Sequence, residues 1–369
     1  MLALAAFDSE TVSLHKHRPY ILAARNVHKS FVYACALLDL DVNFLFSSNK
    51  NAHLCSCNVT PKDVETALST CKTPPCAVYV TSPDYLGNIL DIKGISNICH
   101  RYGVPLLVDN AHGAYLAFMD KPMHPIALGA DMCCDSAHKT LPALTGAGYL
   151  HISKSAPKSF VRNARSRLSM FASTSPSYLI LQSLDLCNKY ISEEIRPLIS
   201  RTEKRIKQIR YSLEEKGFSL VGDELFKLTL DLSKTGITGS LAAEYLRLHY
   251  EIECEYSDNN YLVMMLSPQN SKTDLDKLLE ALLTIPQKST ANPLEPGHNF
   301  CLKRACTIRQ AIFSPHETVP VRNSVGRICA SPTVSCPPAV PIAISGEVIT
   351  EPTAKLFAFY GIDEIDVLK

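Results

Sequence analysis

Two short polar clusters in the segment 104–153 follow apolar runs and carry residue types that can do amine chemistry. The run VPLLV ends in Asp109, within VDNAHG, and the run MCC leads into DSAHKT, which contains Lys139. A lysine amine can form a Schiff base with an aldehyde cofactor, and a buried carboxylate can keep a pyridine nitrogen protonated. The pairing of Asp109 with Lys139 therefore suggests a site for pyridoxal 5′-phosphate (PLP), used as an electron sink.

Three other polar residues of this segment invite plainer interpretations. We interpret Asp135 as a cap of a helix or turn, because an aspartate at a strand end commonly has that role. His151 ends an apolar strand, which favours a structural role with satisfied hydrogen bonds. His124 lies in a Pro-rich loop and is expected at the surface.

Short apolar runs that alternate with helical segments must position the two clusters. The predicted strands are 20–23, 77–81, 106–109, 132–135 and 149–152, and the predicted helices are 28–38, 60–70 and 92–102. This alternation is typical of an α/β fold with a mostly parallel sheet and helices on both faces. Chemistry in such sheets sits at the carboxyl ends of the strands, so we expect both clusters at one edge of one sheet.

Two smaller regions follow the large domain, which we assign to residues 1–178. Residues 179–290 are expected to form a helical connection and a small α+β domain. Its predicted helices are 179–191, 195–216, 240–249 and 271–283, and its predicted strands are 218–221, 226–231, 252–256 and 261–267. A Pro-rich linker at 286–299 then leads to a short C-terminal domain, 300–369.

Composition excludes several classes of protein. The 37 Lys and Arg residues balance 36 Asp and Glu residues, for a net charge of +1, which argues against a nucleic-acid binder. No run approaches 18 apolar residues, so we expect no membrane span. The first residues do not resemble a signal peptide. The fourteen cysteines lack paired metal-ligand spacing, so we expect no metal site and reduced thiols in the cytoplasm.

Motifs along nearly the whole chain resemble those of the bacterial ornithine/lysine/arginine decarboxylases. RNVHKS at 25–30 resembles the RNxHKS motif of that family, TSPDYLG at 81–87 its TsPtYyG turn, and STSPSY at 173–178 its STSPSY segment. The segment from Cys336 to Glu347 resembles its PPGxP…PGE pattern. The resemblance implies a PLP-dependent, aminotransferase-like large domain of fold type I, a smaller α+β domain and a short C-terminal decarboxylase-type domain.

The resemblance also assigns roles around the cofactor. It implies that Lys139 binds PLP covalently and that Asp109 pairs with the pyridine nitrogen. His28 would stack over the ring, and we name His28 and Lys139 as the catalytic residues. His112 would reach the 3′ oxygen of the cofactor, and Ala111 would pack against the face of the ring.

Further roles follow from the same resemblance. Ser136 and His138 would contact the phosphate. Ser173 and Thr174 would lie near a subunit boundary, where they could approach the cofactor of the partner in a homodimer. The distal cation of a basic substrate needs a carboxylate, and Glu347 is the candidate.

The chain departs from the family pattern before RNVHKS. Family members carry a longer segment there, with a Gly/Ser-rich loop that opens a helix and binds phosphate through backbone N–H groups. Here residues 1–18 precede the first predicted strand and contain no glycine. We therefore expect that the sequence lacks this N-terminal segment.

The predicted function is PLP-dependent decarboxylation of a basic amino acid (arginine, lysine or ornithine) to the corresponding amine and CO₂. The PPxxP…GE module at the C-terminal end favours this reaction over that of an aminotransferase or another PLP lyase on the same fold, which stays an alternative. An inactive or partner-dependent fragment without the phosphate-binding loop is a further alternative. The sequence does not distinguish the three basic amino acids.

Overall fold

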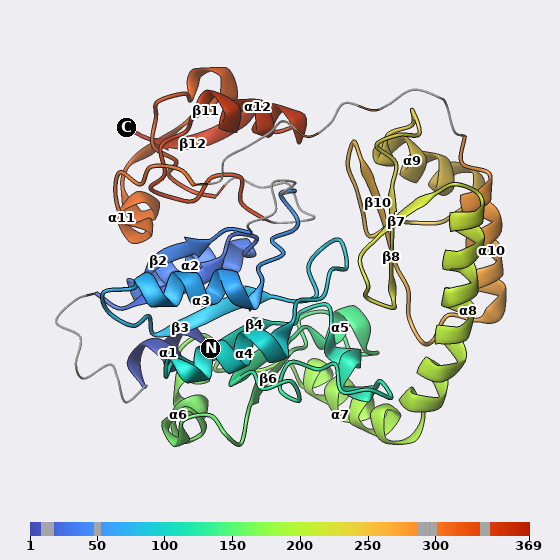
Figure 1. Ribbon diagram of the computed structural model, residues 1–369, viewed down its shortest axis with the longest axis horizontal. Helices are drawn as coiled ribbons and strands as arrows, with labels where there is room; N and C mark the ends of the chain where they lie inside the picture. Colours follow the sequence, from blue (N-terminus) through green and yellow to red (C-terminus); the bar gives the residue numbers. More distant parts are fainter. Residues whose placement is uncertain (9–17, 48–52, 287–291, 293–294, 296–300, 333–339) are drawn as a thin grey trace.

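A computed structural model of the chain describes residues 1–8, 18–47, 53–286, 292, 295, 301–332 and 340–369. Figure 1 shows three regions, each with its own sheet. The CPP sequence at 336–338 and most of the Pro-rich linker lie outside the described residues. The domain boundaries stay a prediction.

The large region is built on a six-stranded sheet with the order β2-β1-β3-β4-β5-β6. Its strands are β1 (Tyr20–Ala24), β2 (Asp41–Leu45), β3 (Ala77–Thr81), β4 (Leu106–Asp109), β5 (Met132–Asp135) and β6 (Tyr149–Ile152). All neighbours pair in parallel except β5 and β6, which are antiparallel. The mostly parallel sheet is confirmed, but β2 was missed because the polar Asp41 and Asn43 interrupt its apolar pattern.

Helices cover both faces of this sheet because successive strand residues point to opposite sides. Leu22, Val78 and Leu106 face the cluster that includes α3 (Pro61–Thr70) and α4 (Ile92–Arg101). Ile21, Tyr79 and Leu107 face the opposite cluster, beside α1 (Leu2–Phe7), α2 (Lys29–Leu38) and α6 (Lys158–Ser169). The doubly covered sheet explains why its strands are almost wholly apolar.

Helix α3 illustrates how local sequence sets an element. Thr60 Oγ1 accepts a hydrogen bond from the backbone N–H of Asp63 (3.2 Å), and the Asp63 carboxylate accepts one from the backbone N–H of Thr60 (2.8 Å). Pro61 fills the first helical position, where its missing N–H costs nothing. Such a cap contributes about 1 kcal/mol, and α3 begins where the sequence predicts.

The second region packs helices against a four-stranded antiparallel sheet with the order β7-β8-β10-β9. Its elements are α7 (Tyr178–Glu193), α8 (Ile195–Glu215), β7 (Ser219–Val221), β8 (Lys227–Asp231), α9 (Gly239–Tyr250), β9 (Tyr256–Ser257), β10 (Tyr261–Met265) and α10 (Lys272–Leu283). The strand predicted at 252–256 is wrong, since only Tyr256 of that range lies in β9. Glu251 ends α9 with φ of 56°, and the chain turns before it reaches β10.

The third region has a small apolar cluster of its own. Its elements are α11 (Ile308–Phe313), β11 (His316–Pro320), α12 (Glu351–Phe359) and β12 (Glu364–Leu368), with β11 and β12 antiparallel. In Figure 1 this region lies above the large sheet. Among the described helices, none is both long enough and apolar enough to cross a membrane.

A buried arginine joins the C-terminal region to the end of β1. The guanidinium of Arg25 donates to the carbonyl oxygens of Pro341 (2.8 Å) and Ile342 (2.9 Å), and lies 3.6 Å from the carboxylate of Glu347. Glu347 also accepts a hydrogen bond from the backbone N–H of Ile344 (2.7 Å). Both charged side chains are buried, so each depends on the other for compensation.

Substitution Arg25→Ala should lower the free energy of unfolding by about 3 kcal/mol, because it leaves the Glu347 carboxylate buried without its cation. Urea denaturation followed by circular dichroism measures this loss. The matched control is Arg327→Ala, which breaks a half-exposed ion pair with Glu317 and should cost less than about 1 kcal/mol. Equal losses in the two variants would contradict a special role for the buried pair.

Candidate active site

The loops that follow β1, β3, β4 and β5 enclose a cavity of about 370 Å³. This is the carboxyl edge of the parallel strands, where the sequence analysis expects the two polar clusters. Seven predicted site residues line the cavity together. They are His28, Asp109, Ala111, His112, Ser136, His138 and Lys139.

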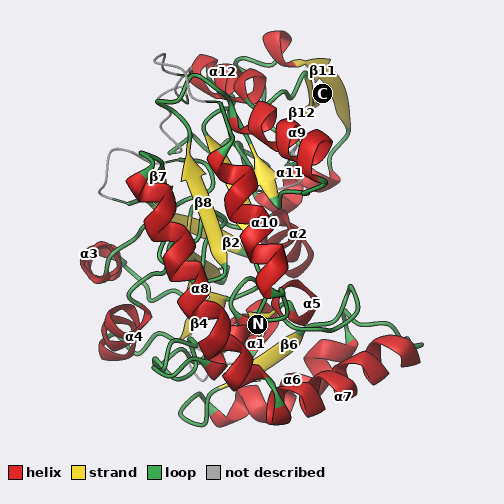
Figure 2. Cartoon of the chain, turned by 90° about the vertical axis from the view of Figure 1, so that its right-hand side faces the viewer, coloured by secondary structure: helices red, strands yellow, loops and turns green. Residues whose placement is uncertain are grey.

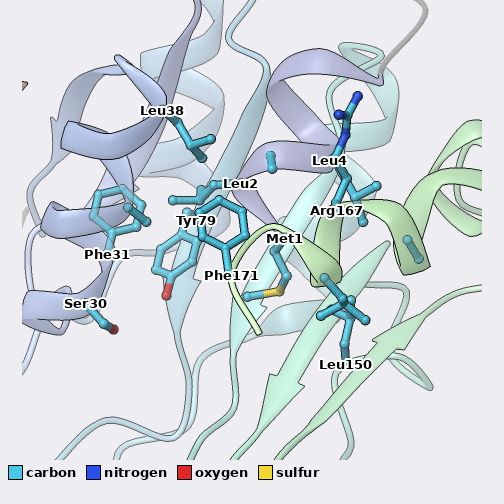
Figure 3. A pocket seen from close by; sticks show the side chains of 14 residues that line it. Met1, Leu2, Leu4, Ser30, Phe31, Leu38, Tyr79, Leu150, Arg167 and Phe171 are labelled. Carbon is cyan, nitrogen blue, oxygen red and sulfur yellow. The ribbon is translucent and has the colours of Figure 1, made fainter. Parts of the chain in front are cut away.

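Asp109 ends β4 and is held by hydrogen bonds. Its carboxylate accepts one from the hydroxyl of Tyr79 (3.1 Å) and one from the backbone N–H of Ala111 (3.2 Å). The Tyr79 ring packs on Phe31, with ring centroids 4.5 Å apart. Figure 3 shows this pair in an apolar pocket beside α1 and α2, which Met1 and Phe171 also line. The carboxylate at the cavity is therefore oriented by a tyrosine anchored in the apolar core.

Lys139 and His112 meet inside the cavity. Lys139 lies in the short helix α5 (Ala137–Thr140), and its Nζ is 3.0 Å from Nε2 of His112. Burial lowers the pKa of His112 well below its usual value, and the charges of Lys227 and Lys139 lower it further. His112 is therefore a neutral imidazole in contact with a primary amine.

His28 is the residue before the first turn of α2, and its ring can both cap the helix and contact a ligand in the cavity. Its Nδ1 accepts a hydrogen bond from the backbone N–H of Ser30 (3.2 Å), so His28 caps the helix. Burial lowers the pKa of His28, and the nearby charge of Asp109 opposes that shift. A largely neutral, half-buried ring at the cavity wall suits a stacking contact with a flat ligand.

Ser136 and His138 border the cavity beside Lys139. Ser136 precedes the first residue of α5, and its side chain makes no capping hydrogen bond. His138 is fixed from behind, because its Nδ1 lies 2.9 Å from the carbonyl oxygen of Ala147. The polar atoms of these two residues that can contact a ligand are therefore Nε2 of His138 and the hydroxyl oxygen of Ser136.

Three predicted residues lie elsewhere. Ser173 and Thr174 are exposed between α6 and α7 and do not line the cavity. Glu347 is buried against Arg25 and is likewise absent from the lining. The roles predicted for Ser173 and Thr174 at a partner's cofactor, and for Glu347 at the substrate, stay predictions.

Several lining or adjoining residues were missed from the sequence. Asn26 Oδ1 and Thr81 Oγ1 are buried at the cavity without a hydrogen-bond partner among the described residues. Buried polar atoms are normally paired, so both offer contacts to a bound polar molecule. Tyr85 also lines the cavity, with its ring centroid 5.1 Å from that of His112. Lys227 begins β8 and contacts His112. Its sequence signal was a lone lysine inside the apolar run FKLTLDL, which could have marked it as a buried charged residue.

A second polar cluster lies behind the cavity and corrects two interpretations. Asp135 is no cap: its Oδ2 lies 3.1 Å from His124 Nε2 and 3.0 Å from His151 Nε2, and its Oδ1 accepts from the Asn110 amide (2.7 Å). His124 is buried, not at the surface. The backbone N–H of Ile126 donates to His124 Nδ1 (3.4 Å), so Nε2 is the ring nitrogen whose proton faces Asp135. The cluster is a hydrogen-bonded network that ties β5 to β6.

Comparisons with known proteins show the family of this chain. The model of the family described as Orn/Lys/Arg decarboxylase, major domain, matches residues 10–229. An arginine decarboxylase of Bacillus subtilis is 32% identical over 350 residues, which cover 90% of this chain and 71% of that protein. An arginine decarboxylase of Halalkalibacterium halodurans is 30% identical, with 90% and 70% covered.

Solved structures show the same fold. The constitutive lysine decarboxylase of E. coli superimposes with a TM-score of 0.73 at 19% identity, over 97% of this chain and 68% of that one. Lysine decarboxylase A of Pseudomonas aeruginosa gives a TM-score of 0.76 at 16% identity, over 97% and 67%. Together these neighbours confirm the expected fold type I architecture.

The Asp135 network should make stability depend on pH. Burial alone would raise the pKa of Asp135, but the hydrogen bonds from His124 and His151 lower it to about 2. Because the folded pKa is depressed, the carboxylate stabilises the protein above its unfolded pKa, and this contribution is lost as the pH falls toward 2. Substitution Asp135→Asn should cost about 2 kcal/mol at pH 7.

Urea denaturation at several pH values checks this expectation. The difference between the wild type and Asp135→Asn should shrink as the pH falls from about 4 toward 2. The control Glu351→Gln removes an exposed pair with Lys355 and should change stability by less than about 0.5 kcal/mol. A difference for Asp135→Asn that does not change with pH would contradict the network.

Proposed function

Since the chain belongs to the family of Orn/Lys/Arg decarboxylases, we propose that it catalyses the PLP-dependent decarboxylation of a basic amino acid to the corresponding amine and CO₂. The observation that carries the proposal is the joint position of Lys139, Asp109 and His112 in one cavity at the carboxyl edge of the sheet. Decarboxylation follows from the family, since many reactions share this fold.

The residues at the cavity fit PLP. The Lys139 amine would hold it covalently, Asp109 would pair with the pyridine nitrogen, and His28 and Ala111 would contact the ring. Ser136 and His138 would contact the phosphate. The cavity volume, about 370 Å³, lies in the range of small-molecule sites, and the unpaired atoms of Asn26 and Thr81 offer polar contacts.

The protein would support the reaction mainly through fixed charges. When bound, PLP supplies an electron sink for the electron pair that remains at Cα after CO₂ leaves. The Asp109 carboxylate would keep a proton at the ring nitrogen, and the Tyr79 hydroxyl donates a hydrogen bond that orients this carboxylate. The Lys139 amine would be the group that returns a proton to Cα.

Relatives favour arginine as the first substrate to test. The Bacillus subtilis and Halalkalibacterium halodurans proteins that are 32% and 30% identical are both named arginine decarboxylase. The lysine decarboxylases among the structural neighbours are below 20% identity and bear on the fold alone. Recognition of a guanidinium would use a carboxylate that can accept two parallel hydrogen bonds. Glu347, predicted for that role, would first have to leave its buried pairing with Arg25 outside the cavity lining.

We also infer that the chain works as a homodimer. Figure 2 shows the helices α6 and α7 at one edge of the molecule. We call the exposed apolar side chains of α6, of α7 and of the residues just after α6 the α6–α7 apolar face. Its side chains are Val161, Leu168, Met170, Phe171, Tyr178, Leu179, Leu181 and Leu186. Large exposed apolar surfaces mark interaction sites. Ser173 and Thr174 lie within the same stretch, as expected for residues near a subunit boundary.

A cytoplasmic location is part of the proposal. Cys35, Cys76 and Cys99 are buried as free thiols in the apolar core. Free thiols of this kind are typical of proteins from reducing compartments.

The absorbance spectrum with added PLP tests the cofactor site. Wild type should gain a visible band that borohydride reduction bleaches, and a separate, unreduced sample should release CO₂ from arginine, lysine or ornithine. Lys139→Ala should show neither, because it lacks the amine that forms the covalent link. Lys154→Ala, at a lysine outside the cavity lining, is the control and should behave as wild type. Identical spectra for wild type and Lys139→Ala would contradict the site.

Light scattering after gel filtration tests the dimer. Wild type should show twice the mass of one chain, and the double variant Leu179→Asp/Leu186→Asp should be monomeric, because charges on an apolar interface oppose its burial. The matched control is Leu241→Asp/Leu248→Asp, with the same spacing and similar exposure on α9, which should remain dimeric. A dimer that survives the first pair of substitutions would exclude this face as the interface.

A further inference from the structure

Lys227 is a buried lysine of the small sheet whose amine contacts His112, a residue that lines the active-site cavity. It begins β8, and its side chain has no exposed surface. Its Nζ lies 3.0 Å from Nδ1 of His112, 3.1 Å from the carbonyl oxygen of Asp84 and 3.9 Å from the Glu224 carboxylate. The other nitrogen of His112 faces Lys139, so one imidazole bridges two lysine amines.

The surroundings of Lys227 match a charged ammonium group. An ammonium has three N–H donors and no acceptor, and three acceptors face Nζ. Burial lowers the pKa of Lys227, and the charges of Glu224, Asp84 and Glu255 oppose that shift. Nζ also lies 5.6 Å from the centre of the Tyr85 ring, which adds a cation–π contact.

The carboxylate of Glu224 lies opposite Lys227 and is held by hydrogen bonds; burial raises its pKa, and the charge of Lys227 opposes that shift. Its Oε1 accepts from the Tyr115 hydroxyl (2.6 Å) and from the backbone N–H of Phe226 (3.1 Å). The ion pairs of the described residues include Lys227 with Glu224 and none with Lys139. The carboxylate that balances a lysine charge in this network therefore lies beside Lys227 and not beside Lys139.

The number of protons that Lys227, His112 and Lys139 share decides the protonation state that we assign to each of them. A neutral imidazole carries one N–H. If the Lys227 ammonium donates to Nδ1, the ring proton is on Nε2 and points at Lys139. Lys139 must then accept that hydrogen bond with a nitrogen lone pair. The reverse arrangement puts the ammonium on Lys139 and removes from the buried Glu224 carboxylate the cation that lies 3.9 Å from it, which is costly.

We propose that Lys227 is a positioning residue that holds His112 in the tautomer with its proton on Nε2, and so keeps Lys139 as the unprotonated amine that attack on an aldehyde requires. When the aldehyde ligand arrives, the Nε2–H turns from the amine to an oxygen of the ligand, which releases the lone pair of Lys139. In the attack that lone pair forms the new C–N bond, and both amine protons leave with the aldehyde oxygen as water. The role of this arrangement in catalysis rests on the proposed function. The assignment of the His112 proton to Nε2 does not.

Two measurements on the full chain without PLP test the proposal. Nitrogen-15 NMR of histidine-labelled protein reports which ring nitrogen of His112 is protonated, with His112→Gln for assignment. Carbamylation by cyanate, followed by mass spectrometry at Lys139, reports the free amine, because cyanate reacts with the unprotonated form. Neither readout depends on PLP, so a failure of cofactor binding would not alter them.

The test variant is Lys227→Met/Glu224→Gln, which removes both charges together and so avoids leaving one buried alone. The matched control is Thr229→Val, which removes a buried hydrogen bond from the same strand without touching His112. Wild type and control should show the proton on Nε2. The double variant should lose that preference, and carbamylation of Lys139 should slow at least about fivefold, as the amine then retains a proton in most molecules.

Either of two results would overturn the proposal. A wild-type His112 with its proton on Nδ1 would do so directly, whether or not the double variant folds. So would a folded double variant with unchanged tautomer and unchanged carbamylation. Slower carbamylation in Thr229→Val as well would show a structural effect of the strand and equally refute a specific role for Lys227.

Discussion

The Asp109 carboxylate is buried at the carboxyl edge of the sheet and needs hydrogen-bond donors held in fixed positions. Much of the structure around the cavity depends on this requirement. Asp109 cannot face the cavity as a carboxylate unless donors hold it, so Tyr79 extends from the neighbouring strand to provide one. Tyr79 in turn needs an apolar surface for its ring, which Phe31 of α2 supplies. The helix on one face of the sheet thereby helps to orient a carboxylate at its edge.

The sequence predicts what depends on local pattern and on the geometry of parallel sheets. Strands that end in Asp109 and Asp135 must present their following residues at one edge, so the meeting of the Asp109 and Lys139 clusters was predictable without a structure. Helix α3 was predictable because Thr60, Pro61 and Asp63 form a cap within four residues. Neither inference needs contacts between distant parts of the chain.

What the sequence did not reveal depends on such distant contacts. Lys227 is separated from His112 by 115 residues, and nothing in the pattern of β8 shows which group its amine will meet. His124 was expected at the surface because Pro-rich loops are usually exposed, yet a carboxylate eleven residues away draws it inside. Glu347 matched a family motif, but its pairing with Arg25 joins residues 322 positions apart in the sequence.

Residues of two regions line the cavity, and the small-sheet region contacts one of them, His112; this has a consequence for how the site becomes competent. The large region supplies Asp109, His112 and Lys139, while Val340 of the C-terminal region closes part of the wall. Lys227 comes from the small sheet and is the cation that faces Nδ1 of His112. Without it, the neutral imidazole would have no fixed donor at Nδ1, and either ring nitrogen could carry the proton. Docking of the small sheet against the large one therefore contributes to the protonation pattern of the site as well as to its shape.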